Sequence, residues 1–313
     1  MQRPLGGMLV VDLTRYVPGA FATAELLRLG ARIVRVEQPG GDPMRATAES
    51  WHDALNAGKE SVVCDLPAEA EFARGLLARA DVVVESFRPG VAARLGVGPD
   101  DAPETAVYCS ITGFGTAGRH EQRAGHDLNY VGWAGLLERT APALPPVQVA
   151  DFAAGALGAV TEILAALVAR ARTGEGARLV VSMTHGSHRL ASRAPVLTSG
   201  FACYRMYETA DGRHLTVAAL EPRFFRRVCE LLDLPELAVR QYDADQDALG
   251  SELAEVFRRR SLDEWLDVFE REDACVGPVA TLAEAEADLG VPPPGHAAAL
   301  GAHTAGWRRE LGL

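Results

Sequence analysis

The chain has 313 residues, of which 48% are hydrophobic and 23% charged, and its 31 basic and 42 acidic residues give a net charge of −11. This length and composition are typical of a soluble globular protein with one large domain or two modest ones. The acidic balance argues against nucleic acid as the main partner, although it leaves room for a local basic pocket that binds a phosphorylated ligand.

The cysteines and the N-terminus indicate where the protein resides. Five cysteines are scattered without any Cys-x-x-Cys pair, and their odd number is typical of reduced thiols: Cys64, Cys109, Cys203, Cys229 and Cys275. The first residues lack the apolar core of a signal peptide, and we find no apolar run that approaches about 18 residues, the length of a membrane-spanning helix. We therefore expect a cytoplasmic protein without a membrane partner.

The first half of the chain alternates short apolar runs with segments of helical periodicity. Strands are predicted at residues 8–13, 31–37, 61–66, 81–85 and 106–111, and helices at about 20–30 and 68–80. This βαβ order predicts a parallel sheet. Each strand runs into a loop with Gly or Pro, and ligands of such sheets bind at the carboxyl ends of the strands. The Gly-x-Gly-x-x-Gly fingerprint is absent, which argues against a nicotinamide or flavin dinucleotide site of the usual form.

The second half predicts a smaller unit. A long Ala- and Leu-rich helix is predicted from Asp151 to about residue 172, a strand at 178–182, and a polar crossing segment at 184–200. Beyond it, two alternating runs flank Asp211-Gly212 and predict a hairpin, and helices follow at about 223–232, 248–259 and 261–270. We therefore expect an α/β protein with a Rossmann-like large domain at 1–185, a linker at 186–200, a small α+β domain at 201–280, and a tail at 281–313 that returns to the large domain.

One imidazole and one carboxylate are candidate acid–base groups. His126 lies in a Gly-flanked turn, and Asp151 opens the Ala- and Gly-rich helix. If the fold brings them to opposite sides of one bound carbon, they can remove a proton from one face and return it to the other. Taken alone, a loop histidine is more often a surface residue, and Asp151 is most simply a helix N-cap. The two roles of Asp151 are compatible, because a cap lies at the positive end of the helix dipole.

Motifs in collinear order along nearly the whole chain resemble the superfamily of type III CoA-transferases (CaiB/BaiF) and α-methylacyl-CoA racemases. They lie at residues 13–19, 29–43, 55–66, 85–90, 110–115, 125–130, 173–176, 207–212 and 219–225. Gly-His-Asp-Leu-Asn-Tyr at 125–130 is similar to the racemase branch. The transferase branch typically lacks a histidine at position 126 and carries a run of glycines that this sequence does not have.

The resemblance implies roles for particular residues. It implies His126 and Asp151 as the two bases, and Glu221 as the residue that holds and polarises the imidazole. It also implies an interlocked homodimer, in which Glu221 can come from the second chain. It also implies an acyl-CoA substrate held by Lys59, Val63, Cys64, Asp65, Leu66, Arg88, Gly125, Asp127, Leu128, Asn129 and Tyr130. For Lys59 and Arg88, a solvated surface charge is the alternative. No cofactor beyond the CoA of the substrate and no metal is implied, and His185 and His188 are interpreted as surface residues.

Two features depart from the family pattern. Gln38 stands where the family usually has a cation that contacts the CoA phosphates, and Ala57 stands where racemases often have arginine. Losing such charges weakens a phosphate clamp. The chain is also shorter than the family pattern near 185–198 and 290–300, which bears on how two chains interlock.

We expect a racemase that inverts the α-carbon of a 2-methylacyl-CoA thioester by two-base proton transfer. The enolate formed on the way needs stabilisation, for which backbone N–H groups near Asp127 or at the start of the helix after Asp151 are candidates. One alternative is a CoA transferase in which Asp151 is the nucleophile that forms an acyl anhydride. The other is a diverged relative that only binds a ligand or acts on a non-CoA or carrier-bound substrate. Solvent exchange of the α-hydrogen distinguishes the racemase, and an acyl adduct at Asp151 the transferase.

Overall fold

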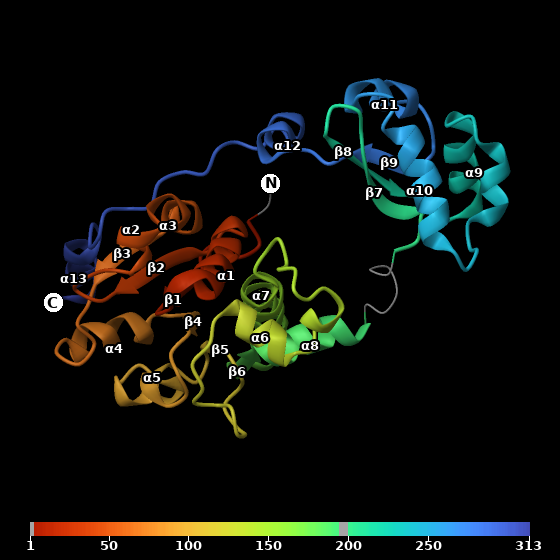
Figure 1. Ribbon diagram of the computed structural model, residues 1–313. Helices are drawn as coiled ribbons and strands as arrows, with labels where there is room; N and C mark the ends of the chain where they lie inside the picture. Colours follow the sequence, from red (N-terminus) through yellow and green to blue (C-terminus); the bar gives the residue numbers. More distant parts are fainter. Residues whose placement is uncertain (1–2, 194–199) are drawn as a thin grey trace. The chain divides into compact units, whose positions relative to one another are not determined.

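The computed structural model describes residues 3–193 and 200–313, which form two compact units (Figure 1). The first comprises the chain up to Arg193 together with Pro293–Leu313, and the second comprises Ala194–Pro292. The first unit extends past the expected boundary at 185, because helix α8 (Met183–Arg193) packs on the preceding helical segment instead of forming a linker. Residues 194–199 of the expected linker lie outside the described residues.

A six-stranded parallel sheet forms the centre of the first unit. Its order is β3-β2-β1-β4-β5-β6. The strands are β1 (Leu9–Asp12), β2 (Arg32–Glu37), β3 (Glu60–Val63), β4 (Val82–Glu85), β5 (Val107–Thr112) and β6 (Ala177–Ser182). This is the order of a doubly wound Rossmann fold, in which the direction of winding reverses between β1 and β4 and leaves a crevice at the carboxyl ends of the strands. The predicted α/β class and parallel sheet are confirmed.

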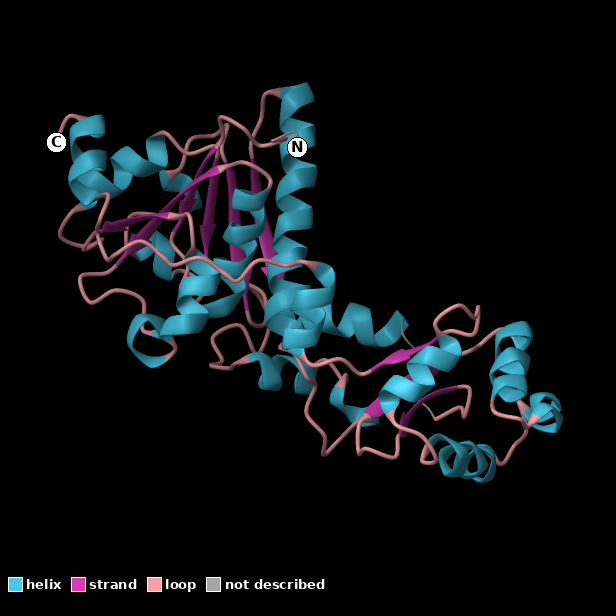
Figure 2. Cartoon of the chain, turned by 90° about the horizontal axis from the view of Figure 1, so that it is seen from above, coloured by secondary structure: helices cyan, strands magenta, loops and turns pink. Residues whose placement is uncertain are grey.

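Helices cover both faces of this sheet, as Figure 2 shows. Successive strand residues point to opposite faces. Accordingly, Val10 lies in a core with α1 (Tyr16–Arg28) and α7 (Gly158–Thr173), whereas Val11 lies in a core with α4 (Ala70–Ala78) and Trp307 of α13 (Thr304–Leu311). The remaining helical segments of this unit are α2 (Met44–Thr47), α3 (Glu49–Asn56), α5 (Val91–Arg94), η1 (Pro99–Asp101), α6 (Asp127–Trp133), η2 (Leu137–Arg139) and η3 (Val149–Leu157).

One helix differs from expectation in its hydropathy. The π-helical segment η3 continues into α7, and the 25 residues of Val149–Thr173 include a window of mean hydropathy 1.9. By length and composition this helix is able to cross a membrane, contrary to our expectation that no apolar run is long enough. Small alanine residues, together with larger apolar ones, supply much of the hydropathy of this segment, and Asp151 and Glu162 interrupt it. Its buried residues, such as Ile163, pack in the core of the first unit, and core helices of soluble proteins meet the same criterion.

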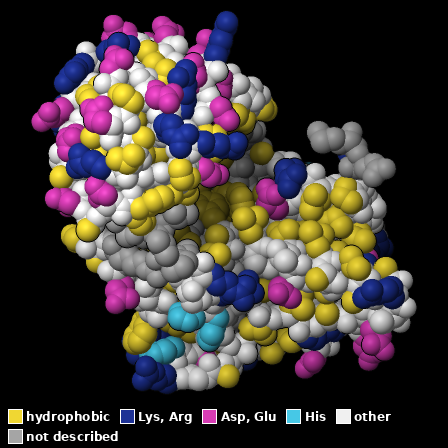
Figure 3. All heavy atoms as spheres, turned by 90° about the vertical axis from the view of Figure 1, so that its right-hand side faces the viewer, with side chains coloured by type: hydrophobic (Ala, Val, Ile, Leu, Met, Phe, Trp, Pro, Cys, Tyr) yellow, Lys and Arg dark blue, Asp and Glu magenta, His cyan; other side chains and the backbone are white. Residues whose placement is uncertain are grey.

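Some large apolar side chains of this unit remain exposed. Val168 of α7 is 61% exposed and Val180 of the edge strand β6 is 52% exposed. Figure 3 shows one face of the molecule, on which hydrophobic side chains gather between charged ones.

The second unit has its own sheet and core. Its antiparallel sheet, in the order β7-β8-β9, is formed by β7 (Tyr204–Glu208), β8 (His214–Ala218) and β9 (Val276–Pro278). The predicted hairpin is present, and Gly212 at its turn has φ +73°, a conformation that favours glycine. Phe225, Phe257 and Trp265 are buried in the core. The helical segments are α9 (Pro222–Leu231), η4 (Pro235–Arg240), α10 (Gln246–Phe257), α11 (Leu262–Phe269) and α12 (Leu282–Leu289).

Candidate active site

Three adjoining cavities lie near the carboxyl ends of the parallel strands. The first, here the end cavity, has a volume of about 320 Å³ and is lined by the loops that follow β1, β2 and β3. The second, the central cavity, measures about 530 Å³ and shares Arg15 and Phe87 with the end cavity. The third, the apolar cavity, measures about 440 Å³ and shares Tyr16, His126 and Asp151 with the central cavity. Each has the size of a small-molecule site, so together they can hold an extended ligand.

His126 stands at the start of helix α6, where an extended backbone makes it the N-cap. Its N–H donates to Oδ1 of Asn129 at 3.0 Å, and its carbonyl accepts the Asn129 N–H at 2.9 Å. These bonds fix the backbone, while the imidazole is exposed to both the central and apolar cavities. The sequence predicted only a turn here, because seven residues are too few to show helical periodicity.

Two glycines make room for the ring of Tyr130 beneath His126. A Cβ on Gly113 would lie 2.5 Å from the Tyr130 ring, and one on Gly125 would lie 2.8 Å from it. The Tyr130 hydroxyl donates to the carbonyl oxygen of Gly125 at 2.5 Å. The Gly-His pair is therefore held by a buried tyrosine three residues into the helix, which explains this residue pattern.

Asp151 lies in the first turn of η3, a π-helical segment of the kind often found at functional sites. The N-cap is Gln148, so the N-cap role considered for Asp151 is wrong. The Asp151 N–H donates to Oδ1 of Asp127 at 2.9 Å. Burial, with the nearby Asp127 charge as a smaller cause, raises the pKa of Asp151 to about 7. A carboxyl group that titrates near neutral pH can both accept and donate a proton.

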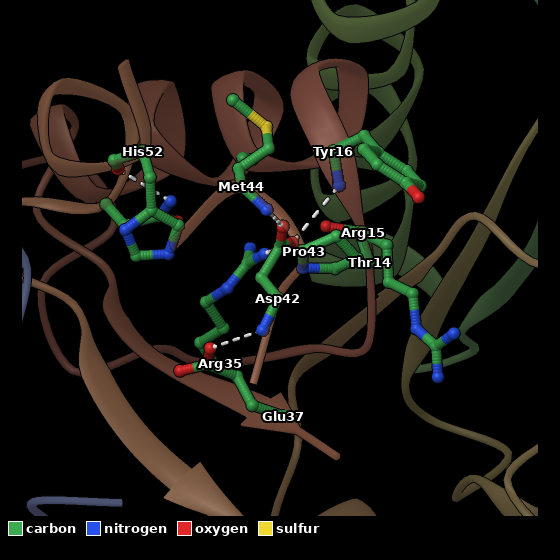
Figure 4. Close-up of polar contacts among 12 residues, drawn as sticks. Thr14, Arg15, Tyr16, Arg35, Glu37, Asp42, Pro43, Met44 and His52 are labelled. Atoms are coloured by element: carbon green, nitrogen blue, oxygen red, sulfur yellow. Dashed lines mark hydrogen bonds and ion pairs between the residues drawn. The ribbon is translucent and has the colours of Figure 1, made fainter. Parts of the chain in front are cut away.

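A buried ion network forms part of the wall of the end cavity, which Arg35 and Asp42 line (Figure 4). Arg35 contacts Asp12 at 3.3 Å and Asp42 at 2.5 Å, and all three side chains are almost fully buried. Asp42 accepts the N–H groups of Tyr16 at 3.2 Å and of Met44 at 2.8 Å. Tyr16 and Met44 both line the apolar cavity, so the network fixes part of its wall.

Lys59, the only lysine of the chain, is buried in this interior and does not line the end, central or apolar cavity. Its Nζ donates to Ala20 O at 2.7 Å, Thr23 Oγ1 at 2.8 Å and Asn56 Oδ1 at 2.9 Å. All three N–H groups are therefore occupied inside the fold, and burial lowers the pKa of Lys59 to about 7. This arrangement does not fit the phosphate contact, or the solvated surface charge, that we expected for Lys59.

The other residues expected to bind CoA are divided among the cavities. Cys64, Asp65 and Leu66 line the end cavity, whereas the Val63 N–H donates to Thr304 of the C-terminal segment at 2.9 Å. Arg88, Gly125, Asn129 and Tyr130 line the central cavity, and Asp127 and Leu128 line the apolar one. Gln38 lines the end cavity, while Ala57 pairs with Ala297.

Glu221 belongs to the second unit. It is the exposed N-cap of helix α9 and directly follows the β7–β8 hairpin. The residues that line the central and apolar cavities all belong to the first unit, so a contribution of Glu221 to this site is a proposal.

Several lining residues were not predicted. Arg15 and Tyr16 follow β1 directly, Phe87 follows β4, and Arg123 precedes Gly125. For Arg15, Tyr16 and Phe87, the position shortly after a strand was the available indication, because loops at the carboxyl ends of parallel strands form ligand sites. Trp51 and Leu144 of the apolar cavity come from α3 and from a loop, and no sequence pattern pointed to them.

Metal chemistry has no evident site in the ranges 3–193 and 200–313, where no three His, Cys, Asp or Glu side chains are grouped as metal ligands. His185 and His188 are both exposed. Nδ1 of His185 lies 2.7 Å from Oγ of Ser182, and Nδ1 of His188 lies 3.0 Å from the carbonyl oxygen of Ala134.

The chain is similar to known proteins along almost its whole length. The family model described as CoA-transferase family III matches residues 5–304. Human alpha-methylacyl-CoA racemase is 35% identical, covering 90% of this chain and 78% of that protein, and human succinyl-CoA:glutarate CoA-transferase is 31% identical, covering 88% and 72%. The crystal structure of a CAIB/BAIF family protein from Brucella suis has a TM-score of 0.84 at 27% identity, covering 99% of this chain and all of that one. The chain therefore belongs to CoA-transferase family III, an enzyme family that includes both CoA-transferases and racemases.

Proposed function

We propose that this protein is a racemase that inverts the α-carbon of a 2-methylacyl-CoA thioester. The observation that carries the proposal is that His126 and Asp151 line the same two cavities, with a pKa near 7 for Asp151. An acid–base group on each side of the α-carbon suits a reaction that must run in either direction.

In this mechanism His126 removes the α-proton of one enantiomer, and the protonated Asp151 delivers a proton to the opposite face of the enolate. The reverse reaction exchanges the roles. The thioester oxygen gains negative charge in the transition state, and Arg88 and Arg123 lie in the wall of the central cavity where a cation would stabilise that charge. Of the backbone N–H groups at the start of η3, that of Asp151 donates to Asp127 at 2.9 Å and that of Phe152 to the carbonyl oxygen of Gln148 at 3.0 Å, so neither is free for this task.

The distribution of charge suggests how the substrate lies. Arg15 lines both the end and the central cavity, so a phosphate-bearing CoA group fits on the side of the end cavity. The apolar cavity is lined by Met44, Trp51 and other apolar side chains, which suit a branched acyl chain. The substrate's own CoA is the only cofactor in this proposal.

A CoA transferase that uses Asp151 as its nucleophile is the second candidate. The 31% identity to a glutarate CoA-transferase favours it. Its chemistry also needs only one carboxylate at the site, that of Asp151. Burial raises the pKa of Asp151 and so disfavours the ionised carboxylate that a nucleophile requires, which argues against this candidate. A diverged relative acting on a non-CoA or carrier-bound group remains a third reading, for which Gln38 in the end cavity is the supporting feature.

We further propose a cytoplasmic homodimer in which Glu221 of a second copy completes the site by polarising His126. Val168 and Val180, which are 61% and 52% exposed, are candidate interface residues in this dimer. All five cysteines are free thiols, and four of them are buried, which fits a reducing compartment.

The test is incubation of each enantiomer of a 2-methylacyl-CoA in deuterated water, followed by NMR and chiral analysis. We expect α-deuterium incorporation with loss of chirality. His126→Ala and Asp151→Ala should each abolish inversion, and each should also abolish exchange of the enantiomer that the missing base deprotonates. His185→Ala, which changes an exposed histidine outside the central and apolar cavities, is the matched control and should remain active. An acyl adduct on Asp151 without deuterium incorporation would contradict the racemase and support the transferase. If neither exchange nor an adduct is observed, the protein is a relative that only binds a ligand.

A further inference from the structure

Tyr16 has an unusual backbone conformation at the junction of the central and apolar cavities. Its φ is +62°, in the left-handed region that side-chain-bearing residues rarely adopt. Such a conformation is costly and persists only when its surroundings impose it, and it often occurs at functional sites. The contacts of Tyr16 therefore indicate what the conformation achieves.

Three consecutive N–H groups in the turn after β1 are each held by a side chain. Thr14 donates to Asp12 Oδ1 at 2.9 Å, Arg15 to Ser86 Oγ at 3.1 Å, and Tyr16 to Asp42 Oδ2 at 3.2 Å. The turn is also compact, since a Cβ on Gly19 would lie 2.2 Å from Thr14. These contacts leave the chain little freedom before helix α1 begins.

Asp42 is the member of this set that is tied most firmly to the core. Its Oδ2 contacts Arg35 at 2.5 Å, and its Oδ1 accepts the Met44 N–H at 2.8 Å (Figure 4). Asp42 and Arg35 are each no more than 4% exposed. A charged pair this deeply buried holds its geometry, because either partner alone would be an uncompensated charge.

The imposed conformation brings the Tyr16 ring to the candidate base. The rings of Tyr16 and His126 are 6.5 Å apart between centroids at an interplanar angle of 85°, an edge-to-face arrangement. Tyr16 is nevertheless 47% exposed, and its ring lines both the central and the apolar cavity. The ring therefore limits where the imidazole can lie while leaving access for a substrate.

We propose that Asp42 is a positioning residue for His126, acting through the left-handed backbone of Tyr16, whose ring fixes the imidazole between the two cavities. The effect on catalysis rests on the proposed racemase function, but the effect on the imidazole does not. If Asp42 only stabilises the fold, changing Asp42 should lower stability without moving the imidazole of His126. If Asp42 positions His126, the imidazole should move.

Variants of Tyr16 and of Asp42 separate these roles. Tyr16→Gly removes the ring and also relieves the backbone strain, so we expect a melting temperature equal to or above that of the wild type together with a loss of activity. Tyr16→Phe keeps the ring and should restore activity. Asp42→Asn should resemble Tyr16→Gly in activity, but with lower stability. If loss of the Asp42 charge prevents folding, the double variant Arg35→Gln/Asp42→Asn replaces it.

The first readout is the imidazole signal of His126 in protein labelled at histidine, identified by its loss in His126→Ala. We expect it to move in Tyr16→Gly and in the folded Asp42 variant. The signal should stay in place in Glu60→Gln, which is the matched control. Glu60 also pairs with an arginine, Arg32, but it lies at the amino end of β3. An unchanged His126 signal in the folded Asp42 variant would overturn the inference, whatever reaction the protein catalyses.

The second readout is α-hydrogen exchange without inversion, measured separately for each enantiomer. Asp151→Asn identifies the enantiomer that His126 deprotonates, because only its exchange survives. Tyr16→Gly and Asp42→Asn should slow exchange of that enantiomer by about 10- to 100-fold, the effect of a misplaced base, and slow the other by much less. Equal slowing of both enantiomers would overturn the positioning role. A wild type that exchanges neither enantiomer would refute the proposed function, and the His126 signal would then decide the positioning role.

Discussion

The backbone N–H of Asp151 donates to the carboxylate of Asp127 at 2.9 Å, so two acids lie side by side at the start of η3. Asp127 raises the pKa of Asp151 through its charge, although burial is the larger cause. Asp127→Asn removes this charge and keeps an oxygen that can accept the hydrogen bond. We therefore expect a modest fall in the pKa of Asp151 from about 7, measured by NMR titration of the aspartate carboxyl carbons. An unchanged midpoint would mean that burial alone sets the pKa.

The same raised pKa predicts a pH-dependent stability. The folded-state pKa of Asp151 is about 7, against 3.8 for the ordinary group, so the folded protein holds an extra proton between these values. The stabilising contribution is complete below about pH 4 and is lost as the pH rises through 7.

Asp151→Asn cannot ionise and escapes this loss. Relative to the wild type, it should gain about 1–3 kcal/mol in the free energy of unfolding between pH 5 and pH 8, a figure reduced because Asp151 retains some solvent contact. Urea unfolding at both pH values measures the gain, with Glu175→Gln as an exposed control. A difference that is the same at both pH values would contradict the raised pKa.

The sequence predicted the framework of the fold better than the details of the site. Strands such as Val82–Glu85 are short apolar runs buried on both faces, and Asp211-Gly212 is a local turn, so both are encoded by neighbouring residues. The first turn of η3, which begins at Val149, is not encoded in this way. The Asp151 N–H in this turn donates to Asp127, which is 24 residues away in the sequence.

Burial and backbone strain account for the other differences. The sequence contains Lys59 but does not show that its ammonium group is enclosed by α1 and α3. The left-handed conformation of Tyr16 is likewise not apparent, because it is imposed by Asp42, a residue in a different loop. His126 and Asp151 were found through the family resemblance, and the structure adds that they line the same cavities.

Lys59 should matter for stability and not for ligand binding. Lys59→Met leaves the buried acceptors Ala20 O, Thr23 and Asn56 without their donor and removes a cation 3.8 Å from the buried Asp12. We expect the free energy of unfolding to fall by about 2–4 kcal/mol. The Kd of the folded variant for CoA, measured by calorimetry below the unfolding temperature, should match the wild type. Weaker CoA binding with unchanged stability would restore the phosphate-binding role.

Gln38 offers a test of the end cavity as the CoA site. It is exposed in the wall of that cavity, at a position where the family usually has a cation. Gln38→Arg should add one charge-assisted contact to a phosphate, which corresponds to roughly a tenfold lower Kd for CoA.

The control for Gln38→Arg is Gln38→Met, which changes the side chain without adding charge and should not tighten binding. Dephospho-CoA then shows which phosphate the new arginine contacts, because a gain that disappears with this ligand assigns the contact to the 3′-phosphate. The gain should also decrease with added salt, since exposed charges are screened. An arginine at position 38 that leaves the affinity for CoA unchanged would place the nucleotide elsewhere and would favour a substrate that does not carry CoA.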